Sequence, residues 1–318
     1  MTSQPDKAYI PLRIIGVEAN DLAKPRDPHW KDQPQRPDWL RIRLQTSDSF
    51  GKIKGMMGNL KLHTVCEEAR CPNIYECWSD GTATFMVMGD TCTRACGFCN
   101  VKTGRPEALD IHEPQHVAEA VQQMGLDHAV ITSVDRDDLP DGGAQHIADT
   151  IEAVRKLNPN TKIEVLIPDF QGDWDAFQLV LNARPDVLNH NTETVPRLYK
   201  RVRNRADYQQ TLDLLRRAHE WRLDHFPGML TKSGIMVGLG ESSEEVEQTI
   251  ADIRAQKTDV LTVGQYMRPT MKHLPVERYW SPEEFSQLRD FALNLGFRFV
   301  EAGPLVRSSY HAKRHRVD

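Results

Sequence analysis

Three cysteines that lie close together in the chain, Cys92, Cys96 and Cys99, form a C-x3-C-x2-C pattern suited to a metal centre. Thiolates are soft ligands that favour zinc, copper(I) or iron–sulfur clusters, and the ligand spacing distinguishes among these. Structural zinc usually needs four ligands in two closely spaced pairs, and no such second pair accompanies these cysteines. Three thiolates on a cluster of four irons leave one iron open. The spacing therefore favours an iron–sulfur cluster that can bind a small molecule.

The same loop has an aromatic residue, Phe98, directly before its last cysteine. Together with the C-x3-C-x2-C spacing, this resembles the motif of the radical S-adenosylmethionine (SAM) superfamily. The resemblance implies that the open iron chelates the amino and carboxylate groups of SAM. Electron transfer from the reduced cluster then breaks the S–C5′ bond and gives a 5′-deoxyadenosyl radical. A zinc knuckle or a chance grouping of cysteines is the structural alternative.

A second cysteine triad lies upstream, where Cys66, Cys71 and Cys77 follow a C-x4-C-x5-C spacing. We expect this triad to hold a second cluster that is also one ligand short. Disulfides explain the cysteines poorly, because all six fall between Cys66 and Cys99 and disulfide frameworks belong to small secreted domains without a large core. Two local metal sites explain the grouping better.

The complete segment CEEARCPNIYECW resembles the lipoyl synthase family, in which these cysteines bind an auxiliary [4Fe–4S] cluster. Near the end of the chain, Arg307-Ser308-Ser309-Tyr310 is similar to that family's RSSY motif, whose second serine, here Ser309, supplies the fourth ligand. Between Gly55 and Ala312 the further similar segments are ITSVDRDDLPDGGA, LNHNTETVPRLYKRVR, KSGIMVGLGE, GQYMRPT and GPLVRSSYHA. The ligands that the resemblance implies are Cys92, Cys96 and Cys99 for the radical-generating cluster, and Cys66, Cys71, Cys77 and Ser309 for the auxiliary one.

The reaction that the resemblance implies replaces two unactivated C–H bonds, at C6 and C8 of an octanoyl chain, by C–S bonds. The octanoyl chain is amide-linked to a lysine of a lipoyl carrier domain. No acid or base can ionise such a C–H bond, so a radical is required. One cluster generates the radical with two SAM molecules, and the auxiliary cluster supplies two sulfides and is consumed. Ser309 binds iron more weakly than a thiolate, and we expect it to make one iron easy to release.

Several partners are implied by this reaction. The carriers are octanoylated lipoyl domains, such as those of 2-oxoacid dehydrogenase E2 subunits and the glycine cleavage H protein. An electron donor such as ferredoxin or flavodoxin is also implied, as is an iron–sulfur carrier that repairs the consumed cluster.

Rival functions make different predictions. Another sulfur-inserting radical SAM enzyme, similar to biotin synthase, would lack the combination of the second triad with RSSY. An electron carrier would use complete C-x2-C-x2-C-x3-C-P ligand sets in a small fold. A zinc-stabilised binding module would be colourless, whereas two [4Fe–4S] clusters predict brown protein with about eight irons per chain.

The elements that must position these residues follow a regular alternation of apolar strands and amphipathic helices. The predicted strands are residues 83–88, 128–134, 162–168, 186–191, 232–240 and 260–266. The predicted helices lie near 114–124, 143–157, 174–183, 208–222, 243–256 and 282–295. Ser242-x-x-Glu245 predicts a capping box at one helix start, and Ser281-Pro282-Glu283-Glu284 predicts a second sharp start with proline at the first helical position.

Six β-then-α units imply an α/β fold with parallel strands, either a partial (βα)6 TIM-type barrel or a doubly wound sheet, and we favour the barrel. In both folds ligands gather at the carboxyl ends of the strands, and the Cys92 loop directly follows the first strand. The SAM contacts predicted at these ends are Thr132, Ser133, Asn191, Glu193 and Arg203, the last of which can pair with a carboxylate. Hydrogen-bonded structural or surface roles are predicted for His63, His190, His273 and His311.

Length and composition set the remaining bounds. We expect a proline-rich N-terminal arm at 1–54, an auxiliary-cluster segment at 55–82, the barrel at 83–296 and a C-terminal extension with RSSY at 297–318. With 40 Lys and Arg against 45 Asp and Glu, the chain lacks the basic field of a nucleic-acid-binding protein. It also lacks an apolar run of about 18 residues and a secretory signal, so no membrane contact and a cytoplasmic location are expected.

Overall fold

A computed structural model describes most of the chain that the cysteine motifs and the predicted barrel occupy. The described residues are 34–40, 55, 57, 58, 60, 62–68, 71, 73, 74, 77, 84–310 and 312. Most of the predicted N-terminal arm, part of the predicted segment 55–82, and His311 lie outside them. Within the arm, the described stretch holds the 3-10 helix η3, Asp38–Leu40, whose last residue is buried.

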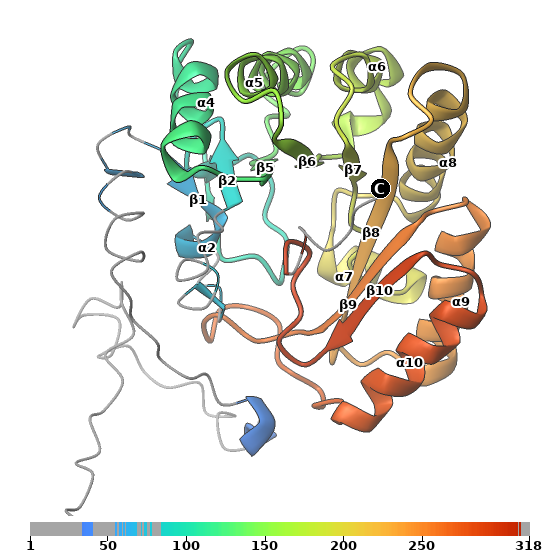
Figure 1. The fold of residues 1–318 in the computed structure, drawn as a ribbon. Coiled ribbons are helices and arrows are strands. Elements are labelled where there is room, and N and C mark those ends of the chain that lie inside the picture. Colours follow the sequence, from blue (N-terminus) through green and yellow to red (C-terminus); the bar gives the residue numbers. More distant parts are fainter. Residues whose placement is uncertain are drawn as a thin grey trace, which may run out of the picture. The chain divides into compact units, whose positions relative to one another are not determined.

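A curved, mostly parallel sheet forms the centre of the described chain (Figure 1). Among the described residues its strand order is β1-β2-β5-β6-β7-β8-β9-β10. The bounds are β1 His63–Thr64, β2 Thr84–Val87, β5 His128–Ser133, β6 Lys162–Leu166, β7 Val187–Asn189, β8 Leu230–Val237, β9 Val260–Gln265 and β10 Phe299–Gly303. From β2 to β10 all neighbouring strands are parallel, whereas β1 pairs with β2 in the antiparallel sense.

The long helices connect the parallel strands and lie along the outer side of the curved sheet (Figure 1). The long ones are α4 Glu113–Met124, α5 Ala144–Leu157, α6 Trp174–Asn182, α8 Tyr208–His225, α9 Ser243–Ala255 and α10 Pro282–Asn294, and two short ones are α2 Val65–Glu68 and α7 Tyr199–Val202. No helix in the described residues is long and apolar enough to cross a membrane.

The order of the strands distinguishes the two predicted architectures. Neighbours in the parallel sheet follow one another along the chain, so every crossover moves on in the same direction. A doubly wound sheet would reverse that direction at a switch point. The prediction of a partial (βα)6 barrel is therefore confirmed.

Both predicted helix starts are also confirmed. The Glu245 N–H donates to the Ser242 hydroxyl at 3.3 Å, and the Ser242 N–H donates to the Glu245 carboxylate at 2.9 Å, which completes a capping box on α9. Ser281 and Glu284 form the same arrangement on α10, where Pro282 is the first helical residue. These reciprocal bonds satisfy main-chain donors that a helix start otherwise leaves unpaired.

The structure contains a strand, β10, that the sequence pattern did not predict. It follows α10, pairs with β9 and ends the sheet. In this strand Val300 is buried, whereas Glu301 and Gly303 are partly exposed, as fits a strand with a neighbour on one side. The apolar run that identifies the other strands is therefore missing. β10 is followed by the segment 305–310, which contains the RSSY motif.

The interior of the barrel is polar and charged, unlike the outer face of the same strands. Ile163 and Val165 of β6 pack in the apolar core, and Glu164 between them lies on the opposite face. The Lys232 ammonium of β8 lies 2.8 Å from a Glu164 carboxylate oxygen, and both side chains are fully buried. Burial alone would raise the pKa of Glu164. The charge of Lys232 and a hydrogen bond from His128 instead lower this pKa to about 2.

Candidate active site

The loop that carries the first cysteine triad begins directly after β2, at the carboxyl ends of the barrel strands. Cys92 ends the short strand β3, Thr91–Cys92, which pairs with β4, Lys102–Thr103. Cys96 and Cys99 lie between these two strands, and the Cys99 N–H donates to the Cys96 carbonyl at 3.2 Å. This is the position in the barrel that the sequence predicts for the triad.

Arg94, within this loop, binds the loop to two neighbouring strand ends. Its buried guanidinium donates to both Asp137 carboxylate oxygens, each at 2.8 Å, and to both Asp169 oxygens, at 2.9 and 2.7 Å. Asp137 follows β5 and Asp169 follows β6. Burial alone would lower the pKa of Arg94, but the hydrogen bonds to Asp137 and Asp169 raise it above its ordinary value. The sequence pattern did not indicate this role, because the partners are 43 and 75 residues away.

Other contacts hold the same loop to later parts of the chain. The Gly97 N–H donates to the carbonyl of Val202, the last residue of α7, at 2.9 Å. His273 donates from Nε2 to the Cys99 carbonyl at 2.9 Å, and its Nδ1 lies 2.9 Å from the Thr270 hydroxyl. His273 is hydrogen-bonded, as predicted, but the sequence did not indicate that it contacts the cysteine loop. Separate parts of the barrel therefore fix the spacing of the three thiols.

The electrostatic surroundings keep the three thiols protonated in the absence of a metal centre. Burial and the charge of Asp135 raise the pKa of Cys92 to about 11. Burial raises the pKa of Cys96 to about 12, against the charge of Arg203, and burial raises the pKa of Cys99 to about 11. Thiolates bind metal, so these cysteines would have to release their protons to bind a positive metal centre that compensates their charge. Three partly buried soft donors fit an iron–sulfur cluster.

Three of the predicted SAM contacts lie together beside this loop. The Asn191 amide donates to the Glu193 carboxylate at 3.0 Å, and the Arg203 guanidinium donates to the Asn191 carbonyl at 2.8 Å. Arg203 interacts electrostatically with Cys96, and Glu193 with Cys99. Burial raises the pKa of Glu193, against the charge of Arg203. The structure thus brings these polar side chains next to the thiols.

Two polar side-chain atoms at the carboxyl ends of β5 and β7 are relevant to whether this site fits SAM. In the described residues, Ser133 Oγ and Asn191 Oδ1 are buried without a hydrogen-bond partner. Leaving a buried polar atom unpaired costs about 1–3 kcal/mol, so such atoms call for an explanation. SAM, with its amino, carboxylate and ribose groups, supplies suitable partners. Thr132 differs, because its hydroxyl already donates to the Leu166 carbonyl at 3.1 Å.

His190 precedes Asn191 and gives the stability of this region a pH dependence. Its Nδ1 donates to the Ile167 carbonyl at 2.9 Å. Burial and the charge of Arg203 lower the pKa of His190 from 6.5 to about 4. Between these two pKa values the unfolded chain binds a proton that the folded chain excludes, so stability is present above pH 6.5 and is lost as the pH falls.

We therefore expect His190 to lower the free energy of unfolding by about 2 kcal/mol between pH 7 and pH 5. Urea titrations at both pH values measure this difference. In a His190→Gln variant, which keeps a polar side chain but does not titrate, the difference should shrink by that amount. An unchanged difference in the variant would assign the pH dependence to other groups.

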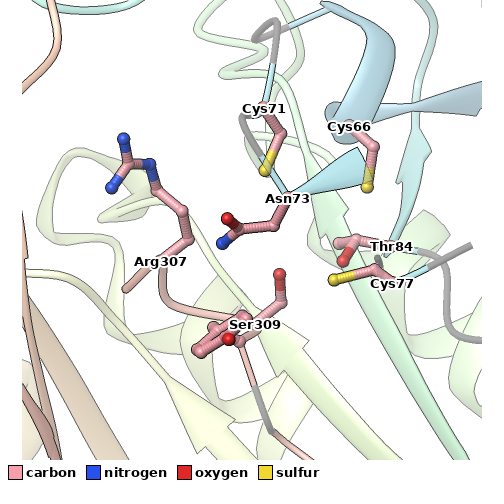
Figure 2. A pocket seen from close by; sticks show the side chains of 8 residues that line it. Cys66, Cys71, Asn73, Cys77, Thr84, Arg307 and Ser309 are labelled. Carbon is pink, nitrogen blue, oxygen red and sulfur yellow. The ribbon is translucent and has the colours of Figure 1, made fainter. Parts of the chain in front are cut away.

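The predicted ligands of the second site line one pocket (Figure 2). The lining residues are Cys66, Cys71, Asn73, Cys77, Thr84, Arg307, Ser309 and Tyr310. Figure 2 shows the three thiols and the Ser309 hydroxyl directed toward the same space. Burial raises the pKa of Cys71, against the charge of Arg307 and a hydrogen bond from the Asn73 main chain. The structure therefore brings Ser309, near the end of the chain, to the upstream cysteines.

The donor set of this pocket, three thiols and one hydroxyl, is compatible with the ligands of an iron–sulfur cluster. No three His, Cys, Asp or Glu side chains in the described part of the chain converge closely enough to hold one metal ion. A structural zinc ion needs four ligand atoms within about 2.0–2.3 Å of one point. The irons of a four-iron cluster each take one protein ligand, so the ligands stand further apart. Three thiols and one hydroxyl are compatible with that arrangement.

Comparison with known proteins relates both cysteine sites to one family. Residues 86–253 match the family model of the radical SAM superfamily. Residues 18–71 match the model of the N-terminal domain of lipoyl synthase of the radical SAM family. The two matches contain the first cysteine triad and the beginning of the second.

Individual relatives extend the match over nearly the whole chain. The lipoyl synthase of Rubrobacter xylanophilus is 57% identical over 89% of this chain and 87% of its own length. The lipoyl synthase of Hahella chejuensis is 55% identical over 96% of this chain and 87% of its own. Among solved structures, methylornithine synthase (PylB) superposes with a TM-score of 0.51 at 14% identity, covering 69% of this chain and 70% of the other. That likeness concerns the fold alone.

Proposed function

The chain belongs to the lipoyl synthase family of radical SAM enzymes, and from this premise we infer the roles of its two cysteine sites. Its activity is that of a lipoyl synthase. The proposed reaction inserts sulfur at C6 and C8 of a lysine-bound octanoyl chain. Its strongest support is the pocket lined by Cys66, Cys71, Cys77 and Ser309, because sulfur insertion needs a sulfur source besides the radical-generating site.

We propose Cys92, Cys96 and Cys99 as the ligands of the radical-generating [4Fe–4S] cluster. When bound, this cluster supplies the electron that cleaves SAM into methionine and a 5′-deoxyadenosyl radical. In this role Arg94 and His273 would keep the three thiols in place, because they bind the loop to different parts of the barrel. No fourth protein ligand is proposed, which leaves a position for SAM.

Arg203, Asn191, Glu193 and Ser133 are the proposed SAM-binding residues. The planar guanidinium of Arg203 suits the SAM carboxylate, which it can bind through two parallel hydrogen bonds. Ser133 Oγ and Asn191 Oδ1 have hydrogen-bonding capacity that the described residues leave unused. Glu193 adds a carboxylate acceptor for a hydroxyl or ammonium group. Thr132, also predicted, would act indirectly, since its hydroxyl already donates a hydrogen bond to the Leu166 carbonyl.

The second pocket is proposed to hold an auxiliary [4Fe–4S] cluster on Cys66, Cys71, Cys77 and Ser309. When bound, this cluster is the source of both inserted sulfur atoms. The Arg307 side chain lies by Cys71, where its positive charge would offset the negative charge of the thiolate ligands. Ser309 contributes a harder oxygen ligand that releases its iron more readily than a thiolate would.

The proposed partners follow from the substrate and from the consumption of sulfur. Octanoylated lipoyl domains of 2-oxoacid dehydrogenase E2 subunits and the glycine cleavage H protein would present the octanoyl-lysine. A ferredoxin or flavodoxin would supply electrons. An iron–sulfur carrier would restore the auxiliary cluster after each lipoyl group is made.

A direct test incubates the reconstituted protein, without oxygen, with SAM, a reductant and an octanoyl-lysine peptide. Mass spectrometry should find two added sulfur atoms in the peptide together with 5′-deoxyadenosine, and the protein should carry about eight irons. In a matched Cys71→Ala variant we expect 5′-deoxyadenosine to form without sulfur insertion. If the unaltered protein also makes 5′-deoxyadenosine but adds no sulfur, the proposed reaction is wrong although the radical chemistry stands.

A further inference from the structure

Asn73 connects the segment of the second triad to the C-terminal segment, and this connection bears on the proposed auxiliary site. Asn73 lies between Cys71 and Cys77 and is 3% exposed. Its side-chain amide donates to the Leu305 carbonyl at 2.7 Å, across 232 residues of chain. Its own carbonyl accepts from the Cys77 N–H at 2.9 Å. Figure 2 shows the Asn73 side chain between Cys71 and Ser309.

A short, internally bonded stretch transmits this contact from Leu305 to Ser309. The Val306 N–H donates to the Gly303 carbonyl at 3.1 Å, and the Tyr310 N–H donates to the Arg307 carbonyl at 2.9 Å. Two consecutive turns therefore follow β10. Because turns of this kind restrict the backbone, the position of Leu305 strongly limits where Ser309 can lie.

Gly264 of β9 provides a second, independent contact for the same stretch. A Cβ atom at this position would overlap the Val306 carbonyl oxygen and approach its carbonyl carbon to 3.1 Å. Both atoms belong to the backbone, so they cannot rotate away as a side chain could. Val306 can therefore pack on the strand only where the strand has no side chain. Gly264 and Asn73 hold neighbouring residues, Val306 and Leu305, from two directions.

We propose that Asn73 is a positioning residue of the auxiliary site: its amide, assisted by the close packing of Val306 on Gly264, places Ser309 against the three cysteines. This inference rests on the proposed function of the pocket. Asn73 lines the pocket but supplies no ligand to the cluster in this role. It couples the local cysteine motif to a ligand that comes from the far end of the sequence.

An Asn73→Asp variant tests the proposal. Aspartate has nearly the same shape, but its carboxylate places an acceptor against the Leu305 carbonyl where a donor is required. We expect lipoyl formation to fall by about tenfold, a typical loss when a residue that orients a metal ligand is changed. Production of 5′-deoxyadenosine should stay within about twofold, and the iron content should stay near eight per chain. The Mössbauer spectrum of the auxiliary iron should match that of a Ser309→Ala variant.

A measurement independent of activity follows the C-terminal segment itself. Trypsin should cleave after Arg307 about tenfold faster in Asn73→Asp, because the segment opens more often. The matched control, Asn158→Asp, alters an asparagine whose amide also donates to main-chain carbonyls, those of Ala118 and Val154, but outside the site. It should change neither tryptic cleavage nor the Mössbauer spectrum.

Gly264→Ala provides a second route to the same result. It should reproduce the faster cleavage and the altered spectrum, whereas Gly303→Ala, whose Cβ would meet only the Val306 side chain at 3.4 Å, should not. Unchanged cleavage and normal lipoyl formation in both Asn73→Asp and Gly264→Ala would overturn the proposal. Loss of the whole auxiliary cluster from Asn73→Asp would also overturn it, since Asn73 would then support the cysteines themselves. Absence of lipoyl product from the unaltered protein would refute the proposed function, while the cleavage rates would still decide the role of Asn73.

Discussion

Replacing Arg94 with methionine is expected to reduce SAM cleavage by about 100-fold and to lower the free energy of unfolding by about 3–5 kcal/mol. The Arg94 side chain is 3% exposed, and that of its partner Asp169 is 2% exposed. Methionine fills a similar volume but removes the cation, which leaves a buried carboxylate uncompensated. The cysteine loop also loses its connection to the ends of β5 and β6. The three thiols would then no longer keep the spacing that the proposed cluster requires.

Urea unfolding and 5′-deoxyadenosine formation measure the two effects of Arg94→Met, and iron content reports on the cluster. Arg136→Met is a matched control, because the Arg136 side chain is 2% exposed whereas its partner Asp138 is 36% exposed. Water can solvate the Asp138 carboxylate when Arg136 is removed. Arg136→Met should therefore lower the free energy of unfolding by at most about 1 kcal/mol and keep SAM cleavage within about twofold. If Arg94→Met keeps its iron and cleaves SAM normally, the anchoring role is wrong.

The barrel could be predicted from the sequence because its strands and helices carry their own apolar patterns. β8 shows this, since Ile235 and Val237 pack in the core next to α9, whose start Ser242 marks. The barrel interior could not be predicted in the same way. Glu164 and Lys232 each stand in an apolar strand, and nothing local indicates that the partner lies 68 residues away. The edge strand β10 escaped prediction because it buries little.

The candidate ligands could be predicted where they are local in the chain. Each cysteine triad has a spacing that can be read from a single stretch of sequence, whereas Ser309 was indicated by resemblance alone. The contacts that position these ligands were not predicted. Asn73 and His273 bind main-chain carbonyls 232 and 174 residues away, and such acceptors leave no trace in the sequence of either partner. Only the folded barrel brings these pairs together.

Ser309→Cys is expected to lower lipoyl formation by about 100-fold, which corresponds to about 2.7 kcal/mol of activation free energy. Ser309 lines the auxiliary pocket with Cys66, Cys71 and Cys77. A thiolate binds iron more strongly than a serine oxygen because it is the softer ligand. Four thiolates would hold the auxiliary iron firmly, and the iron would be slow to leave when its sulfide bonds to carbon. SAM cleavage at Cys92, Cys96 and Cys99 should stay within about twofold, because these residues belong to the other site.

Single-turnover assays distinguish this release effect from a failure to assemble the site. Ser309→Cys should carry as much iron as the unaltered protein and still make 5′-deoxyadenosine, while the lipoyl peptide forms slowly. Ser308→Cys is the matched control, because it adds the same thiol one residue away, at a position that does not line the pocket. Its lipoyl formation should be normal. If Ser309→Cys also makes lipoyl product at the normal rate with full iron content, ligand release does not limit the reaction, and the serine serves to complete the site rather than to open it.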